Sequence, residues 1–223
     1  MGYMSFLKNK IKGNLLIAFV YILFFAFPIY VIFKNPLFVP SLRLTTIFNF
    51  LLRYSALVAL VFLSIEIFIG AFKNSLVNKF GQGVSKFHTI NGTLTYILIF
   101  LHPLSLFIGR FLERRVIDPF FVYSDFCVIC ETRPELYLSL GRFAFWLVSF
   151  AFLAALLRSK GWWKDNWKYL HTLNYLVFAL VAFHAWKIGS DIHQYVFIFA
   201  YFGALLLVVA SILYKVFLLI KKK

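Results

Sequence analysis

Four of the five histidines in the chain form two pairs with nearly equal spacing. His88 and His102 are fourteen residues apart, and His171 and His184 are thirteen apart. Both pairs lie in apolar stretches, where an imidazole needs a partner for its ring nitrogens, and a metal ion is one such partner. A single histidine of this kind is explained equally well by packing and a hydrogen bond, but two matched pairs indicate a ligand set.

The spacing places the four histidines at two depths. At about 1.5 Å per helical residue, the pairs span about 21 Å and about 20 Å. In two helices that run in the same direction, His88 faces His171 near one surface, and His102 faces His184 near the other. Zinc needs four ligands at one point, and these levels are too far apart to provide them. Two haems, each held by one histidine from each helix, fit this pattern.

The angular positions of the two pairs differ. Fourteen residues return to within about 40° of the same helix face, whereas thirteen residues end about 140° away. We therefore expect a bulge, a bend or a different side-chain reach in the helix that carries His171 and His184.

Membrane helices are the elements that must hold these histidines. The chain is 62% hydrophobic and 14% charged, whereas soluble domains are about 25% charged. Six apolar stretches reach the length of about 18 residues that indicates a membrane span. The sequence predicts one all-α domain over residues 1–223, a polytopic six-helix bundle with two b haems between the third and fifth helices and no nucleotide-binding domain. Its helices are expected near 14–33, 48–72, 87–109, 138–157, 168–188 and 195–220.

The basic residues indicate a lipid bilayer as the partner rather than nucleic acid. The net charge is +15, but the charges lie between apolar stretches and not along one face. Fourteen of the 23 Lys and Arg residues fall in the N-terminal segment, in 73–86, in 158–168 and at the C-terminal end. The positive-inside rule places these segments in the cytoplasm. We expect a multi-pass protein of the cell (inner) membrane, with both termini cytoplasmic and the long 110–137 loop outside. The apolar stretch near the N-terminus lacks a small-residue cleavage site after it and is interpreted as a retained first span.

The histidine motifs resemble those of the ferric reductase-like transmembrane domain superfamily. The similar stretches are His88-Thr-Ile-Asn-Gly, Leu-His102-Pro, Trp-Lys-Tyr-Leu-His171 and the segment that leads to His184, within residues 45–190. This superfamily includes NADPH oxidases, ferric reductases and MsrQ, the haem subunit of a periplasmic methionine sulfoxide reductase. Its members carry two histidines fourteen apart in the third helix and two thirteen apart in the fifth. Residues 132–184 look most similar to MsrQ, whereas His88 completes the four-ligand set of the reductases and oxidases.

The resemblance implies that the four histidines are axial ligands of two haem b groups. The chain would then be a transmembrane oxidoreductase or its electron-transfer subunit. It would carry electrons from a cytoplasmic flavoprotein or from quinol to an acceptor outside, either a small molecule or a periplasmic reductase. Two alternatives stay open: an MsrQ-like subunit of a periplasmic reductase, and a non-enzymatic haem or metal transporter.

The sequence differs from the ferric reductase-like superfamily in two features, which concern flavin binding and superoxide production. His102-Pro-Leu-Ser is similar to a flavin-binding signature, but it lies inside an apolar span, so we expect flavin only on a separate partner, if at all. Oxidases carry a further histidine four residues after the outer ligand, and this position is Leu106 here. Leu106 argues against superoxide production as the function.

Arg53 is the remaining cofactor-binding candidate. It matches an oxidase arginine near the outer haem, and haem propionates favour arginine partners. The alternative is an arginine that extends its charge to the membrane surface. Arg142 and Lys187 are weaker candidates for the same role.

Glu66 and the Cys127–Cys130 motif have open roles. Glu66 is an acid inside the second span, where it could accept a proton at a quinol site or simply pair with a lysine. The two cysteines form a C-x-x-C in the loop expected outside. They could form a plain disulfide, exchange electrons or bind a metal with neighbouring acids.

Overall fold

The protein is described by a computed structural model over residues 22, 24–127, 129–130, 132–194 and 196–221. These residues contain helices, turns and connecting loops, and no strand among them. The helices are α2 (Leu44–Phe80), α3 (Gly83–Arg114), α4 (Pro119–Tyr123), α5 (Arg133–Leu156), α6 (Trp163–His171), α7 (Asn174–Ile188) and α8 (Phe197–Lys221). A helical segment, Phe24–Lys34, precedes α2. The prediction of an all-α fold is confirmed for the described part of the chain.

Four helices are long and apolar enough to cross a membrane: α2, α3, α5 and α8. They indicate a multi-pass membrane protein whose surface is compatible with a lipid bilayer. The expected fifth span corresponds to α7, which has 15 residues. In the expected first span, 14–33, residues 14–21 and 23 lie outside the described residues, as do Lys8, Lys10 and Lys12. Residues 24–33 of this span lie in the apolar helical segment Phe24–Lys34.

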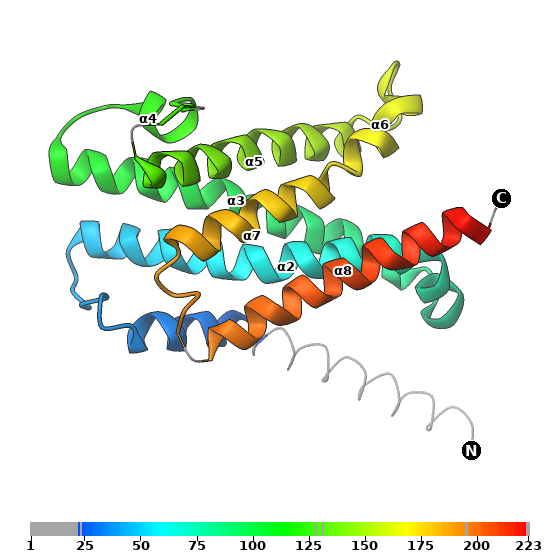
Figure 1. Ribbon diagram of the computed structural model, residues 1–223, viewed down its shortest axis with the longest axis horizontal. Helices are drawn as coiled ribbons and strands as arrows, with labels where there is room; N and C mark the ends of the chain where they lie inside the picture. The colour runs from blue at the N-terminus through cyan, green and yellow to red at the C-terminus, as the bar shows by residue number, and fades with distance from the viewer. Residues whose placement is uncertain (1–21, 23, 128, 131, 195, 222–223) are drawn as a thin grey trace.

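The long helices run roughly along one axis of the molecule (Figure 1). The α2–α3 turn, the α5–α6 connection and the C-terminal end of α8 gather at one end, whereas α4 and the loop around it lie at the other. The connections that sequence analysis assigns to one side of the membrane are therefore at the same end of the bundle.

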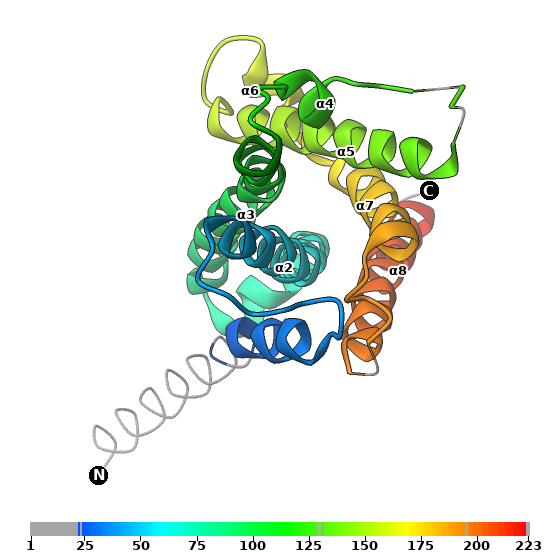
Figure 2. The same cartoon turned by 90° about the vertical axis from the view of Figure 1, so that its left-hand side faces the viewer.

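Helix α2 lies at the centre of the bundle. In its most apolar stretch, 72% of the residues are buried, compared with 17% in the corresponding stretches of α3 and α8. Leu57, Leu60 and Leu63 of α2 pack in one cluster with Val177 of α7 and Phe197 of α8. Seen end-on, α3 lies on one side of α2, while α7 and α8 lie on the other and α5 closes the ring (Figure 2). In this ring of helices, α3 and α7 lie opposite each other.

The predicted fifth helix, 168–188, is not continuous. It is divided into α6, which ends at His171, and α7, which begins at Asn174, with a turn at Thr172 and Leu173. This interruption is the bend that the thirteen-residue spacing required, because it turns the His171 side chain back toward α3. The expected helices 48–72 and 87–109 are present but longer, since α2 and α3 extend beyond them at both ends.

Candidate functional site

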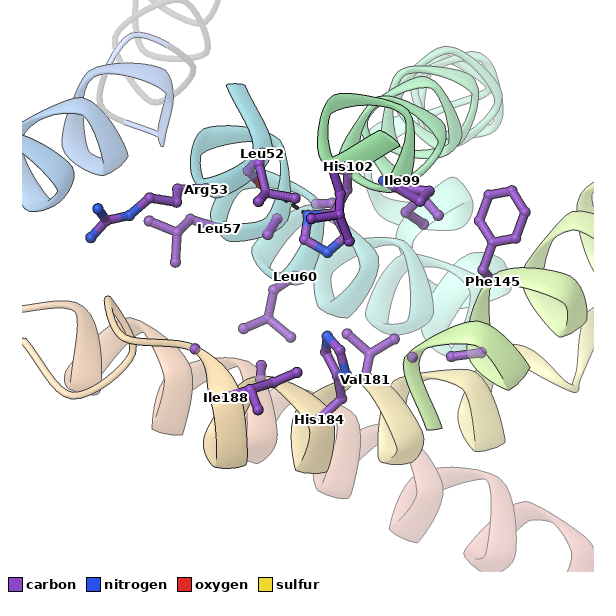
Figure 3. Close-up of a pocket in the computed structure, with 18 of the residues that line it drawn as sticks. Leu52, Arg53, Leu57, Leu60, Ile99, His102, Phe145, Val181, His184 and Ile188 are labelled. Carbon is purple, nitrogen blue, oxygen red and sulfur yellow. Dashed lines mark hydrogen bonds between the residues drawn. The ribbon is translucent and has the colours of Figure 1, made fainter. Parts of the chain in front are cut away.

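His102 and His184 face each other across the bundle near α4. We call them the outer pair, and His88 with His171 the inner pair, after the predicted orientation. The ring centres of the outer pair are 6.5 Å apart, and the ring planes are nearly perpendicular at 89°. The two side chains point toward each other from α3 and α7 (Figure 3). The structure thus brings together two residues that are 82 positions apart in the sequence.

Backbone carbonyls fix the orientation of both outer rings. His102 Nδ1 is 2.9 Å from the carbonyl oxygen of Leu52 in α2, and His184 Nδ1 is 2.8 Å from that of Tyr137 in α5. A carbonyl can only accept a hydrogen bond, so each Nδ1 carries the proton and donates it. Each Nε2 then keeps a free lone pair, which is the tautomer that a metal-ligating histidine needs.

Gly141 of α5 lets the His184 ring lie directly against a helix backbone. A Cβ atom at this position would lie 2.6 Å from His184 Cε1 and 2.7 Å from Nδ1. Side-chain atoms do not approach this closely, so any other residue would displace the ring. Gly141 is therefore a requirement of the outer pair that the sequence did not reveal.

A cavity of about 510 Å³ lies between the outer histidines and the surrounding helices. Its walls include apolar residues of four helices, among them Leu60, Ile99, Phe145 and Val181 (Figure 3). Both outer histidines, Arg53 and Arg142 also border it. Cofactor sites are typically apolar cavities of about 300–1,000 Å³ with a few directed polar groups, and this cavity has those properties.

The inner pair has the same mutual geometry but different partners. The His88 and His171 ring centres are 6.2 Å apart with planes at 87°. His88 Nδ1 lies 2.5 Å from Oε2 of Glu66, so the carboxylate is in direct contact with the ring. Glu66 Oε1 accepts a hydrogen bond from Asn91 Nδ2 at 2.7 Å. Glu66 thus contacts a histidine and an amide rather than a lysine.

His171 is adjacent to Asn174 in the turn that separates α6 and α7. Asn174 Nδ2 is 3.5 Å from His171 Nδ1, and Asn174 Oδ1 is buried without a hydrogen-bond partner among the described residues. His171 also forms a hydrogen bond with the backbone of Ala151 in α5, where a carbonyl accepts the ring proton. His171 can thereby adopt the same tautomer as the outer histidines.

The ring separations fit two imidazoles that bind one metal from opposite sides. With metal–nitrogen bonds of about 2.0 Å, and ring centres about 1.2 Å behind each nitrogen, such centres are about 6.4 Å apart. The observed values are 6.2 and 6.5 Å. His88 and His102 are on the same continuous helix, about 21 Å apart along its axis, so the two pairs form two separate sites.

The chain matches no known family model. A comparison with curated proteins and one with solved structures also find no match. The geometry of the described residues therefore carries the functional assignment.

Arg53 borders the outer cavity, but its charge is neutralised by Asp191. The Arg53 guanidinium donates to both carboxylate oxygens of Asp191, with the Nε–Oδ2 distance at 2.7 Å. Asp191 also accepts from Asn35 Nδ2 at 2.7 Å, and both Asn35 and Asp191 are buried. This network joins α2 to the segment that precedes it and to the connection between α7 and α8. Sequence analysis did not identify Asp191 as the partner of Arg53.

Arg142 is the buried cation of the outer site. Only 6% of this residue is exposed, and its guanidinium donates to the backbone carbonyls of Phe121 and Asp125. The Asp125 carboxylate is 3.9 Å away and largely exposed. Backbone carbonyls carry no net charge, so Arg142 presents more uncompensated positive charge to the cavity than Arg53 does.

Cys127 and Cys130 form a disulfide. Of the three possibilities open from sequence, the structure thus contains the oxidised pair, and a disulfide leaves no thiolate for a metal. The Cys127 backbone N–H donates to the buried hydroxyl of Ser139 at 2.9 Å, which fixes this loop to the first turns of α5. The same part of α5 supplies the Tyr137 carbonyl and Gly141 to His184.

Proposed function

We propose that this protein is a membrane cytochrome that holds two b haems and passes electrons to an acceptor outside the cytoplasm. One observation carries the proposal. Two histidine pairs, at two depths of one helix bundle, have ring separations suited to a single metal between them. The outer pair also presents two Nε2 lone pairs, because both Nδ1 atoms donate to carbonyls.

His102 and His184 would hold the outer haem, and His88 and His171 the inner one. Each haem, when bound, supplies a one-electron carrier. The protein keeps the outer rings in place through the Leu52 and Tyr137 carbonyls, and the walls of the outer cavity are mostly apolar. Arg142, rather than the neutralised Arg53, is the favoured partner of a haem propionate.

In this proposal the chain crosses the inner membrane six times, with both termini in the cytoplasm. Segment Phe24–Lys34 belongs to the first span, and the short helix α7 is part of the fifth. The donor would be a cytoplasmic flavoprotein or quinol, and flavin would reside on that partner. The acceptor would be a small molecule such as a ferric chelate or, in an MsrQ-like arrangement, a periplasmic reductase.

A reduced-minus-oxidised absorption spectrum of the purified protein, with haem counted per chain, tests the proposal. We expect two haems per chain and the sharp reduced bands of six-coordinate iron. A preparation that contains zinc, or no haem, would contradict the assignment. A haem transporter is distinguished by incubation with excess apomyoglobin, which should remove a transported haem but not one held by two histidines.

Reduction of ferric chelates by the dithionite-reduced protein distinguishes the two acceptor classes. Rapid reoxidation by a chelate supports a small-molecule reductase. Slow reoxidation, together with co-purification of a periplasmic protein, supports the MsrQ-like subunit.

A further inference from the structure

A buried carboxylate contacts the inner histidine pair, and none of the described carboxylates contacts the outer pair. Glu66 is 7% exposed, and its Oε2 atom lies 2.5 Å from His88 Nδ1. Asn91, which is 2% exposed, donates to the other carboxylate oxygen. Gly92 leaves space for this carboxylate, since a Cβ atom there would be 3.2 Å from Oε2. The charge is thus held against the ring by its neighbours in α3.

The outer pair has the opposite electrostatic surroundings. Both outer Nδ1 atoms donate to neutral carbonyls, and the carboxylate of Asp191 is occupied by Arg53. The buried guanidinium of Arg142 borders the same cavity as His184. One buried negative charge therefore lies at the inner pair, and one buried positive charge lies at the outer pair.

Other charges near the inner pair act in the opposite direction but are exposed. Lys73 and Arg158 interact with His171, and both side chains are open to solvent. Solvent and salt screen exposed charges, whereas a buried contact at 2.5 Å is screened much less. The negative charge of Glu66 therefore dominates at the inner pair.

We propose that Glu66 and Arg142 set the two haems at different reduction potentials, the inner below the outer, and so direct electrons outward. The inference rests on the proposed function and adds its direction. A negative charge beside a ligand favours ferric over ferrous iron, and a positive charge favours ferrous iron. With haem bound at both pairs, transfer of one electron from the inner to the outer group would then be energetically favourable. Glu66 is a positioning residue, because it acts through His88, whereas Arg142 acts by its charge at the outer cavity.

Spectroelectrochemical titration of the purified, haem-loaded protein tests this inference. In wild type we expect two Nernst components. Glu66→Gln keeps the size of the side chain and one hydrogen-bond acceptor but loses the charge. In this variant the equilibrium constant for reduction of the lower-potential haem should increase by a factor of about ten, which raises its reduction potential by about 59 mV for one electron. In Glu66→Asp, which restores the charge, the lower reduction potential should be close to the wild-type value. Glu113→Gln makes the same change at an exposed carboxylate and should leave both reduction potentials unchanged.

A His102→Ala background, in which the inner haem is the one expected to remain, assigns the shifted component. Arg142→Gln provides a second, independent test, in which the higher of the two reduction potentials should fall. Unchanged potentials in haem-loaded Glu66→Gln would overturn the inference. If Glu66→Gln binds no inner haem, the Arg142 arm decides, and an unchanged higher component overturns the inference. A wild-type protein without haem would instead refute the proposed function itself.

Discussion

The inner and outer histidine pairs have the same ring geometry but are built in different ways. The outer rings are fixed by backbone: two carbonyls accept from Nδ1, and the α5 backbone at Gly141 lies against His184. At the inner pair, His171 likewise forms a hydrogen bond with the backbone of Ala151 in α5, whereas His88 has the Glu66 carboxylate beside it. Backbone contacts fix a ring without adding charge, whereas a side-chain contact can add one. The two pairs therefore differ in the charge beside them, which is the Glu66 carboxylate at the inner pair and the Arg142 guanidinium at the outer cavity.

Removal of a ligand should have the largest effect and should separate the two sites. His102→Ala or His184→Ala should lower the haem content from two to one per chain, because an open coordination position weakens haem binding. His88→Ala or His171→Ala should do the same for the other haem. Haem quantification with the reduced spectrum measures this. His193→Ala, an exposed histidine at the outer end, is the control and should retain both haems.

Addition of one methyl group to a glycine should affect haem binding at the outer site but not at the inner site. Gly141→Ala should remove most of the outer haem, because the new Cβ atom lies 2.6 Å from a His184 ring atom. Gly70→Ala, whose Cβ atom would be 3.7 Å from His88 Cε1, is in ordinary contact distance and should retain the inner haem. Gly203→Ala in α8, where nothing lies within 4 Å, is the control. Equal haem contents in the Gly141 and Gly203 variants would contradict the close approach of α5.

The Arg53–Asp191 pair should stabilise the outer end. Asp191→Asn leaves a buried guanidinium without its counter-charge, and loss of one partner of a buried pair costs about 3–5 kcal/mol. We expect a lower thermal midpoint in detergent, with selective loss of the outer haem on heating. Asp165→Asn, at an exposed site near the inner end, should melt as wild type does. An unchanged midpoint for Asp191→Asn would mean that the pair contributes little.

The Cys127–Cys130 disulfide should have the smallest effect. It closes a very short loop, and by chain entropy such a cross-link contributes at most about 2 kcal/mol. Cys127→Ser combined with Cys130→Ser should therefore retain both haems and lose little thermal stability. If this double variant loses reductase activity while its haem spectrum is unchanged, the disulfide takes part in electron transfer rather than in folding.

Much of the architecture could be predicted from the sequence because apolar length and histidine spacing are local properties. The regions of α2, α3, α5 and α8 were identified from apolar stretches, and the thirteen-residue spacing predicted a deformation that appears as the turn at Thr172 and Leu173. The bounds were less accurate. The expected helix 48–72 extends to Leu44–Phe80, because polar residues at the ends of a span continue a helix without adding to its apolar length.

Contacts across the bundle were the part that the sequence did not reveal. Gly141 was not identified, because a glycine in a membrane helix has many explanations. Asp191 was not identified as a partner of Arg53, yet the two form a buried pair. Glu66 was noted for its charge, but its contact with His88 depends on the packing of α2 against α3.

The sequence by itself determined that this is a helical membrane protein with four histidines at two depths, because composition and periodicity act along one chain. The tertiary structure decided which rings meet, which nitrogen of each outer ring is free, and which buried charge lies beside each pair. Those properties depend on side chains from different helices within a few ångströms of one another, and sequence separation does not encode that proximity.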